Sequence, residues 1–196
     1  MNFVGHAVVA GRQRDDAPFA FGAMVPDLQR LARTPLRVEV DVDGVTAGVE
    51  SHHRADAAFH DSPVFKAWQR TVVESMADRG RGARAAAHVA VELAIDGHLL
   101  QHGRAAAYGR ALAWAAGAVA GPWAVLVERM RTGEVVDAYA TAAGIATRVV
   151  GVMRRRPRLA PITPDVDDLA AGVSAVLAAV RDGADELLEE VSRRSA

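Results

Sequence analysis

Apolar and polar positions repeat along most of the chain with the period of an amphipathic helix. The run Asp15-Asp16-Ala17-Pro18 places acids and a proline where a helix begins, and Asp61-Ser62-Pro63 does so again. The pattern predicts an all-α fold, a single domain over 1–196 with about seven helices. Residues 3–10 form a short apolar segment, and the helical ranges are approximately 19–31, 45–59, from 63 to a break at 79–82, 83–101, 104–120, 133–155 and 165–191.

Two segments depart from this pattern. Residues 36–44 alternate apolar and charged side chains as a strand does, but no other segment offers a partner, so we expect an extended loop or hairpin edge. Residues 111–127 carry no charge and approach the length of a membrane span. Because Gly121-Pro122 interrupts them, two helices joined by a turn are predicted instead.

Composition narrows the chemistry. At 196 residues, with 51% apolar and 5% aromatic residues, the chain can build one core, mainly from Ala, Val and Leu. A net charge of −1 gives no general attraction to nucleic acid or to an anionic membrane. The absence of cysteine excludes disulfides and thiolate ligands. The first residues lack a basic segment followed by an apolar run, so we expect no signal peptide and a cytoplasmic protein.

Residues 52–60 and 88–96 each carry imidazole and carboxylate groups four residues apart, which places them on one helix face. The groups are His52, Asp56 and His60 in the first segment, and His88, Glu92 and Asp96 in the second. These are ligand types for a divalent metal. Apolar neighbours of Glu92 and Asp96 favour an interior polar cluster, and buried acids require a counter-charge from metal or histidine.

Other interpretations stay open at this point. His52, Asp56 and His60 taken alone fit structural hydrogen bonds as well as metal ligation. His88 fits a ligand, a partner of a ligand or an ordinary core histidine equally well. His98 is expected to act with a second histidine four residues later as a helix C-terminal cap.

A longer series of motifs resembles a known family. The series consists of Met1-Asn2-Phe3 with His6, Gly22-Ala23-Met24-Val25-Pro26-Asp27, Gly48, His52, Arg54, Asp56, Pro63, Glu92, Asp96 with Leu99-Leu100, Tyr139, and the run 151–159. Its order and spacing resemble the bacterial acyl carrier protein phosphodiesterase family over nearly the whole chain. Members are helical relatives of the HD-type phosphohydrolases, so the resemblance implies an HD-domain-like bundle.

The resemblance also implies an activity and a set of ligands. Such enzymes hydrolyse the phosphodiester between 4′-phosphopantetheine and a serine of holo acyl carrier protein, with a divalent metal, typically manganese. The implied metal residues are His6, Asp27, His52, Asp56, His60, Glu92 and Asp96. Two of them depart from the family pattern: Glu92 stands where aspartate is usual, and Phe59-His60 replaces a Thr-Asp pair. This departure leaves Fe, Mg and Zn open beside Mn.

Three further assignments complete the hypothesis. Asp56 and Asp96 are expected to take part in catalysis, and Arg54 to hold a phosphate oxygen because guanidinium matches that geometry. The basic run of Arg154, Arg155, Arg156 and Arg158 fits either a helix C-terminus or a docking patch for holo acyl carrier protein. It is too short, and lacks the interleaved aromatics, for nucleic acid.

Two alternative functions stay open, and the oligomeric state is not predicted. The Gly-x-x-x-Pro-Asp element at 22–27 also resembles zinc-dependent phospholipase C-like proteins, which allows another phosphoester substrate. A metal-binding helical module without activity is the third interpretation.

Overall fold

The computed structural model describes residues 1–37, 41–133 and 137–196. Within these ranges the chain is all-helical, with nine α-helices, two short 3₁₀ turns and no strand. The helices are α1 (Phe3–Gln13), α2 (Ala17–Ala32), α3 (Val42–Asp61), α4 (Pro63–Glu74), α5 (Arg81–Gln101), α6 (Ala106–Ala118), α7 (Pro122–Arg131), α8 (Ala142–Arg154) and α9 (Val166–Ser195), and the turns are η1 (Asp137–Ala140) and η2 (Ala160–Ile162).

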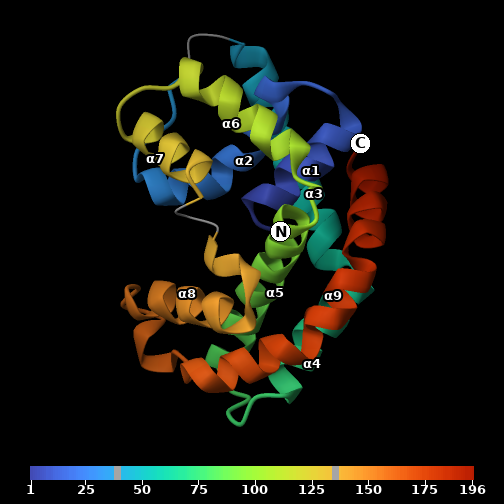
Figure 1. The fold of residues 1–196 in the computed structure, drawn as a ribbon, viewed down its shortest axis with the longest axis vertical. Helices are drawn as coiled ribbons and strands as arrows, with labels where there is room; N and C mark the ends of the chain where they lie inside the picture. Colours follow the sequence, from blue (N-terminus) through green and yellow to red (C-terminus); the bar gives the residue numbers. More distant parts are fainter. Residues whose placement is uncertain (38–40, 134–136) are drawn as a thin grey trace.

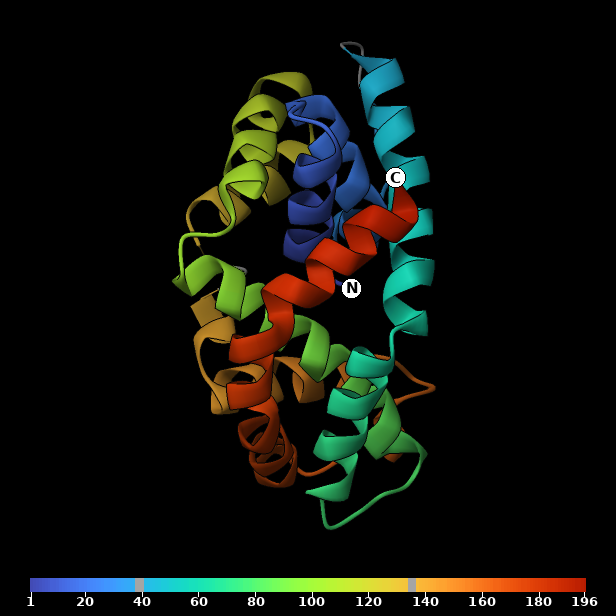
Figure 2. The same ribbon diagram turned by 90° about the vertical axis from the view of Figure 1, so that its right-hand side faces the viewer.

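The helices form two parts of the molecule, which meet near the amino terminus. Helices α1, α2, α6 and α7 lie in the upper part of Figure 1, and α4 and α8 lie in the lower part. The long helix α9 runs between the two parts and contacts α1, α3, α4, α5 and α8. Figure 2 shows α9 crossing in front of this junction, with α3 continuing into α4 beside it. The amino terminus therefore lies in the middle of the molecule.

Side-chain caps begin the helices where the sequence predicts them. The carboxylate of Asp16 accepts a hydrogen bond from the Phe19 amide at the start of α2, and the Ser62 hydroxyl accepts one from the Val64 amide at the start of α4. Asp165 accepts hydrogen bonds from two first-turn amides of α9. Each cap satisfies amides that have no partner within the helix.

Three expectations differ from the structure. The count is nine α-helices in the described residues rather than about seven. The single helix predicted over 133–155 is wrong, because Thr141 is extended and its hydroxyl caps a new helix, α8, after the turn η1. The segment 36–44 is shorter than predicted because α3 begins at Val42, while residues 38–40 of it lie outside the described residues.

The segment 111–127 forms the predicted pair of helices. Helix α6 ends at Ala118, and Gly121, at a φ of 58°, turns the chain into α7. No helix in the described part of the chain has the length and apolar character needed to cross a membrane. The arrangement as an HD-domain-like bundle stays a prediction.

Two glycines allow α2 and α3 to pack at backbone distance. A Cβ atom on Gly48 would overlap the carbonyl oxygen of Phe19, and one on Gly22 would overlap the carbonyl oxygen of Val45. Both glycines therefore permit an approach that any larger residue prevents. This packing brings His52 of α3 against α2 and α1.

Candidate metal centre

The first cluster joins α1 and α3. His6, His52 and Asp56 each offer one ligand atom, and these atoms lie within 4.8 Å of one another. The rings of His6 and His52 stack with centroids 3.8 Å apart, and Nε2 of His6 lies 3.5 Å from Oδ1 of Asp56. We call these three residues the first group.

His52 is oriented by a backbone contact. Its Nδ1 donates a hydrogen bond of 2.9 Å to the carbonyl oxygen of Ala23 on α2. This contact places the proton on Nδ1 and leaves the lone pair of Nε2 free, as in histidines that bind metals. Burial is the main cause that lowers the pKa of His52. The ring is therefore neutral and available as a ligand at neutral pH.

His6 and Asp27 carry buried atoms without partners. In the described structure, neither ring nitrogen of His6 has a hydrogen-bond partner, and nor does Oδ2 of Asp27, which lies 3.9 Å from Nε2 of His6. Burial lowers the pKa of His6 to about 3 and raises the pKa of Asp27 to about 7. Unpaired buried polar atoms are rare and costly, so they indicate a missing partner. A cation beside the first group would supply one.

The second cluster joins α3 and α5. His60, His88 and Glu92 also offer ligand atoms within 4.8 Å of one another. Oε1 of Glu92 lies 3.2 Å from Nε2 of His60 and 3.2 Å from Nε2 of His88. We call these residues the second group. Its burial is intermediate, so it is closer to solvent than the first.

Asp56 connects the two groups. Its Oδ1 faces His6, and its Oδ2 lies 3.2 Å from Nδ1 of His60. Burial opposes the charge on Asp56, but His6, His60 and the α-amino group of Met1 hold its pKa far below the usual range. A carboxylate placed this way turns one oxygen toward each group.

The α-amino group of Met1 lies between the two groups. It donates to Oδ1 of Asp56 at 3.0 Å and to Oε1 of Glu92 at 2.7 Å. Burial lowers the pKa of this amine, but the attraction of the two carboxylates raises it by more, so the net shift is upward. Glu92 keeps a pKa well below the usual range despite its burial, through the same amine and the two histidines. The ammonium therefore occupies an oxygen of each carboxylate, and an ion that bound to either oxygen would have to displace it.

Asp96 lies apart from both groups. Its carboxylate accepts hydrogen bonds from the amides of Val4 and Gly5, at 3.3 and 2.9 Å, and from the side chain of Asn2 at 2.9 Å. These amides belong to the first turn of α1, whose own N-cap residue makes no side-chain bond. Asp96 therefore caps α1 from another helix. Burial, its largest influence, raises its pKa to about 8.

Arg54 also lies away from the centre. Its side chain is exposed on α3, and its Nε donates to the carbonyl oxygen of Ser195, 3.0 Å away, at the end of α9. The helix period explains the difference, because Arg54 is two residues from both His52 and Asp56 and so faces another direction. The predicted contact with phosphate does not follow from this position.

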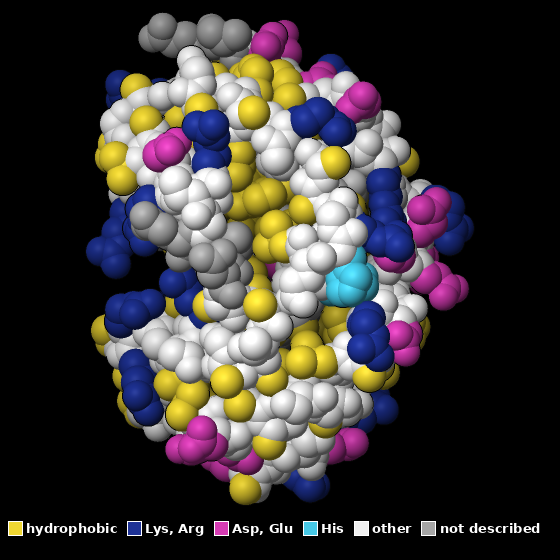
Figure 3. Space-filling view, viewed as in Figure 1, with side chains coloured by type: hydrophobic (Ala, Val, Ile, Leu, Met, Phe, Trp, Pro, Cys, Tyr) yellow, Lys and Arg dark blue, Asp and Glu magenta, His cyan; other side chains and the backbone are white. Residues whose placement is uncertain are grey.

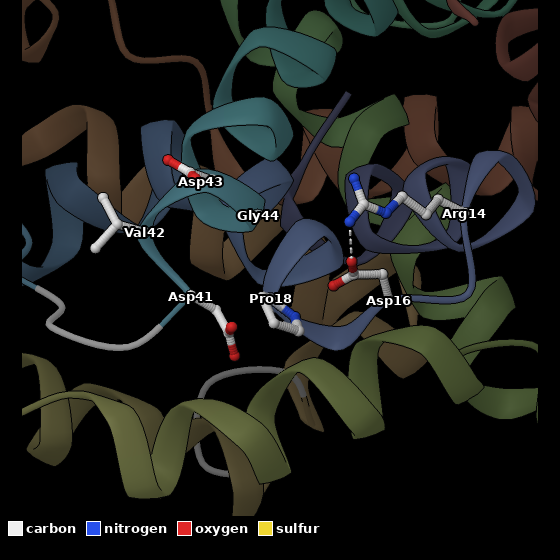
Figure 4. A pocket seen from close by; sticks show the side chains of 7 residues that line it. All are labelled: Arg14, Asp16, Pro18, Asp41, Val42, Asp43 and Gly44. Atoms are coloured by element: carbon white, nitrogen blue, oxygen red, sulfur yellow. Dashed lines mark ion pairs between the residues drawn. The ribbon is translucent and has the colours of Figure 1, made fainter.

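A pocket opens beside the two groups, with Asp27 and Glu92 in its wall. Its volume is about 190 Å³, and its other walls come from α1, α2, α5 and α8. A larger, open hollow of about 540 Å³ lies elsewhere, where α2 and α3 begin (Figure 4). There Arg14 pairs with Asp16, and no histidine lines the wall, so this hollow offers no comparable ligand set.

Sequence reasoning missed one member of the centre and did not settle the role of another. The Met1 amine is a backbone group, which side-chain motifs do not reveal. His88 was left open between three roles because its spacing to Glu92 suits both a ligand and a core residue. The predicted cap is present at the end of α5, where Nδ1 of His102 donates to the carbonyl oxygen of His98 at 2.9 Å.

Comparison of the chain with protein-family models, with curated proteins and with solved structures finds no match in any of the three.

Proposed function

We propose that the two groups bind divalent cations and that the protein is a metal-dependent phosphoester hydrolase. The observation that carries this proposal is the position of Asp56, whose two oxygens face His6 of one group and His60 of the other. The unpaired buried atoms of His6 and Asp27 support an ion at the first group.

The donor set limits which ion is expected. Each group combines two imidazoles with one carboxylate, and Asp27 adds an oxygen near the first. Imidazole suits Zn and Fe, whereas Mg and Ca prefer sites made of oxygens. Mn accepts both donor types and is the ion implied by the family resemblance. We therefore propose Mn first, with Fe and Zn ahead of Mg.

The substrate proposal is 4′-phosphopantetheine on holo acyl carrier protein, and it rests on the family resemblance. The basic run supports it by position. Arg154, Arg155, Arg156 and Arg158 are all exposed after the buried part of α8, and Arg156 also lines the pocket beside the centre. An acidic carrier protein docked there would present its prosthetic group to that pocket.

The reaction would be hydrolysis of one P–O bond. When bound, a divalent cation neutralises phosphate charge and lowers the pKa of water. The oxygen of water bonds to phosphorus, the bond to the leaving alkoxide breaks, one proton of water ends on the alcohol, and the other stays with the product phosphomonoester or is released from it to solvent. Neutral His6 and His52 and ionised Asp56 and Glu92 match the protonation states that metal ligands require.

Turnover tests the proposal. The purified protein is freed of metal, supplied with Mn²⁺ or with EDTA, and incubated with holo acyl carrier protein or bis(p-nitrophenyl) phosphate. His52→Ala removes a proposed ligand, and His53→Ala is its control because His53 is exposed on the same helix. Mass spectrometry detects conversion of the carrier to its apo form. Conversion that requires Mn²⁺, and that is lost in His52→Ala but kept in His53→Ala, supports the proposal.

Two other results have clear meanings. Hydrolysis of the small diester without conversion of the carrier keeps the reaction class and rejects the carrier as substrate. Binding of metal without hydrolysis of either compound contradicts the enzyme proposal and favours a metal-binding module.

A further inference from the structure

The pocket beside the centre combines an apolar wall with arginines that form no ion pair within the described residues. Phe3, Leu93 and Val149 are buried in its wall, and Leu31 and Val89, which also line it, are 43% and 38% exposed overall. The latter two belong to the small set of large apolar side chains left exposed in the described structure. Covering such side chains with an apolar ligand would be favourable.

Three arginines surround the same pocket: Arg30 from α2, Arg148 from α8, and Arg156. Within the described residues, none of them has a carboxylate at ion-pair distance. Arg148 is half-buried and interacts with the hydroxyl of Tyr139, which also lines the pocket. In Figure 3, basic side chains lie on both sides of the notch at the left edge, where α2 faces α8. Guanidinium groups held in this way are suited to phosphate oxygens.

The size of the pocket limits what it can enclose. Its volume of about 190 Å³ is below the roughly 300–1,000 Å³ of pockets that surround a drug-sized ligand. A pocket of this size has room for one anionic head and the first part of an attached chain, and not for a whole drug-sized ligand. Asp27 and Glu92 in the wall place that head beside the two groups.

We infer that this pocket recognises phosphoesters with an apolar arm, Arg148 and Arg30 binding the phosphate oxygens and the wall of Leu31, Val89 and Val152 receiving the arm. This inference rests on the proposed function for the identity of the anion. Of the arginines, Arg148 is the main determinant because its half-buried position restricts its orientation. Arg30 and Arg156 are exposed.

Binding of alkylphosphonates tests this without turnover. Calorimetry with the Mn²⁺-loaded protein would compare methyl- to hexylphosphonate, which cannot be hydrolysed at the P–C bond. Each methylene that enters the pocket should tighten binding about fourfold, until the chain leaves the pocket. Equal affinity across the series would overturn the apolar arm.

Variants separate the anion from the arm. Arg148→Ala should weaken every phosphonate by about 10- to 100-fold, with partial recovery in Arg148→Lys. Arg84→Ala is the matched control, because Arg84 is exposed on α5 and does not line the pocket. Val152→Asn should reduce the gain per methylene and leave methylphosphonate binding unchanged. Equal affinity in the Arg148 and Arg84 variants would overturn the role of Arg148.

The two proposals fail differently. Binding that depends on chain length, without hydrolysis of the corresponding esters, would refute the proposed enzyme and keep the pocket assignment. Metal-dependent hydrolysis without any dependence on the arm would keep the enzyme and refute the pocket assignment.

Discussion

Replacing Asp96 with alanine separates a structural role from a metal ligand. The substitution leaves the amides of Val4 and Gly5 without their acceptor in a buried site. Each unpaired buried donor costs about 1–3 kcal/mol. Removing the buried carboxylate returns part of this cost, so we expect a loss of about 2–5 kcal/mol in the free energy of unfolding.

Urea denaturation followed by circular dichroism measures this loss, with Glu50→Ala as a control. Glu50 is exposed on α3, and its replacement should change the free energy of unfolding by less than about 0.5 kcal/mol. Below its transition, Asp96→Ala should still bind an ion at the second group. Unchanged stability together with loss of all bound metal would refute the capping role and identify Asp96 as a ligand.

Three further predictions concern packing, pH and docking. Gly48→Ala should force α2 and α3 apart. We expect the free energy of unfolding in denaturant to fall by about 1–3 kcal/mol, and metal binding measured by calorimetry to weaken about 10- to 100-fold. Unchanged values of both would contradict the packing account. Burial raises the pKa of Asp27 to about 7, so between pH 4 and 7 the folded protein keeps a proton that the unfolded chain releases. As the pH rises from 4 to 7, the free energy of unfolding of the metal-free protein should therefore fall by up to about 1.4 kcal/mol per pH unit relative to Asp27→Asn. Parallel pH profiles of unfolding for the two proteins would refute this assignment. Neutralising the arginines of 154–158 should slow carrier association measured by surface plasmon resonance and reduce its salt dependence, and an unchanged salt slope would exclude that docking surface.

The sequence was most informative about features that depend on residues close together in the chain. Helix starts at Asp16, Ser62 and Asp165 follow from caps, which depend on residues a few positions apart. The break before α8 was missed because the pattern around Thr141 is compatible with one continuous helix. Spacing of four residues also placed His60 correctly beside Asp56, because both lie on one helix face.

The centre needed information that spacing does not contain. Asp96 lies one helical turn after Glu92 on α5, yet its carboxyl group faces the start of α1 rather than the two groups. Arg54 is expected near phosphate from its proximity in sequence, but its side chain lies toward the end of α9, where it binds the carbonyl oxygen of Ser195. Which helices meet, and on which face, is decided by tertiary packing such as the close approach at Gly48.

The most direct test is the number of bound ions. Metal-free protein would be titrated with Mn²⁺ by calorimetry and checked by elemental analysis, together with His52→Ala and His88→Ala, with circular dichroism confirming that each variant is folded. The account predicts two ions per chain, one lost in each variant. Failure of the folded parent protein to bind Mn²⁺, Fe²⁺ or Zn²⁺, or full binding in both variants, would contradict the metal centre.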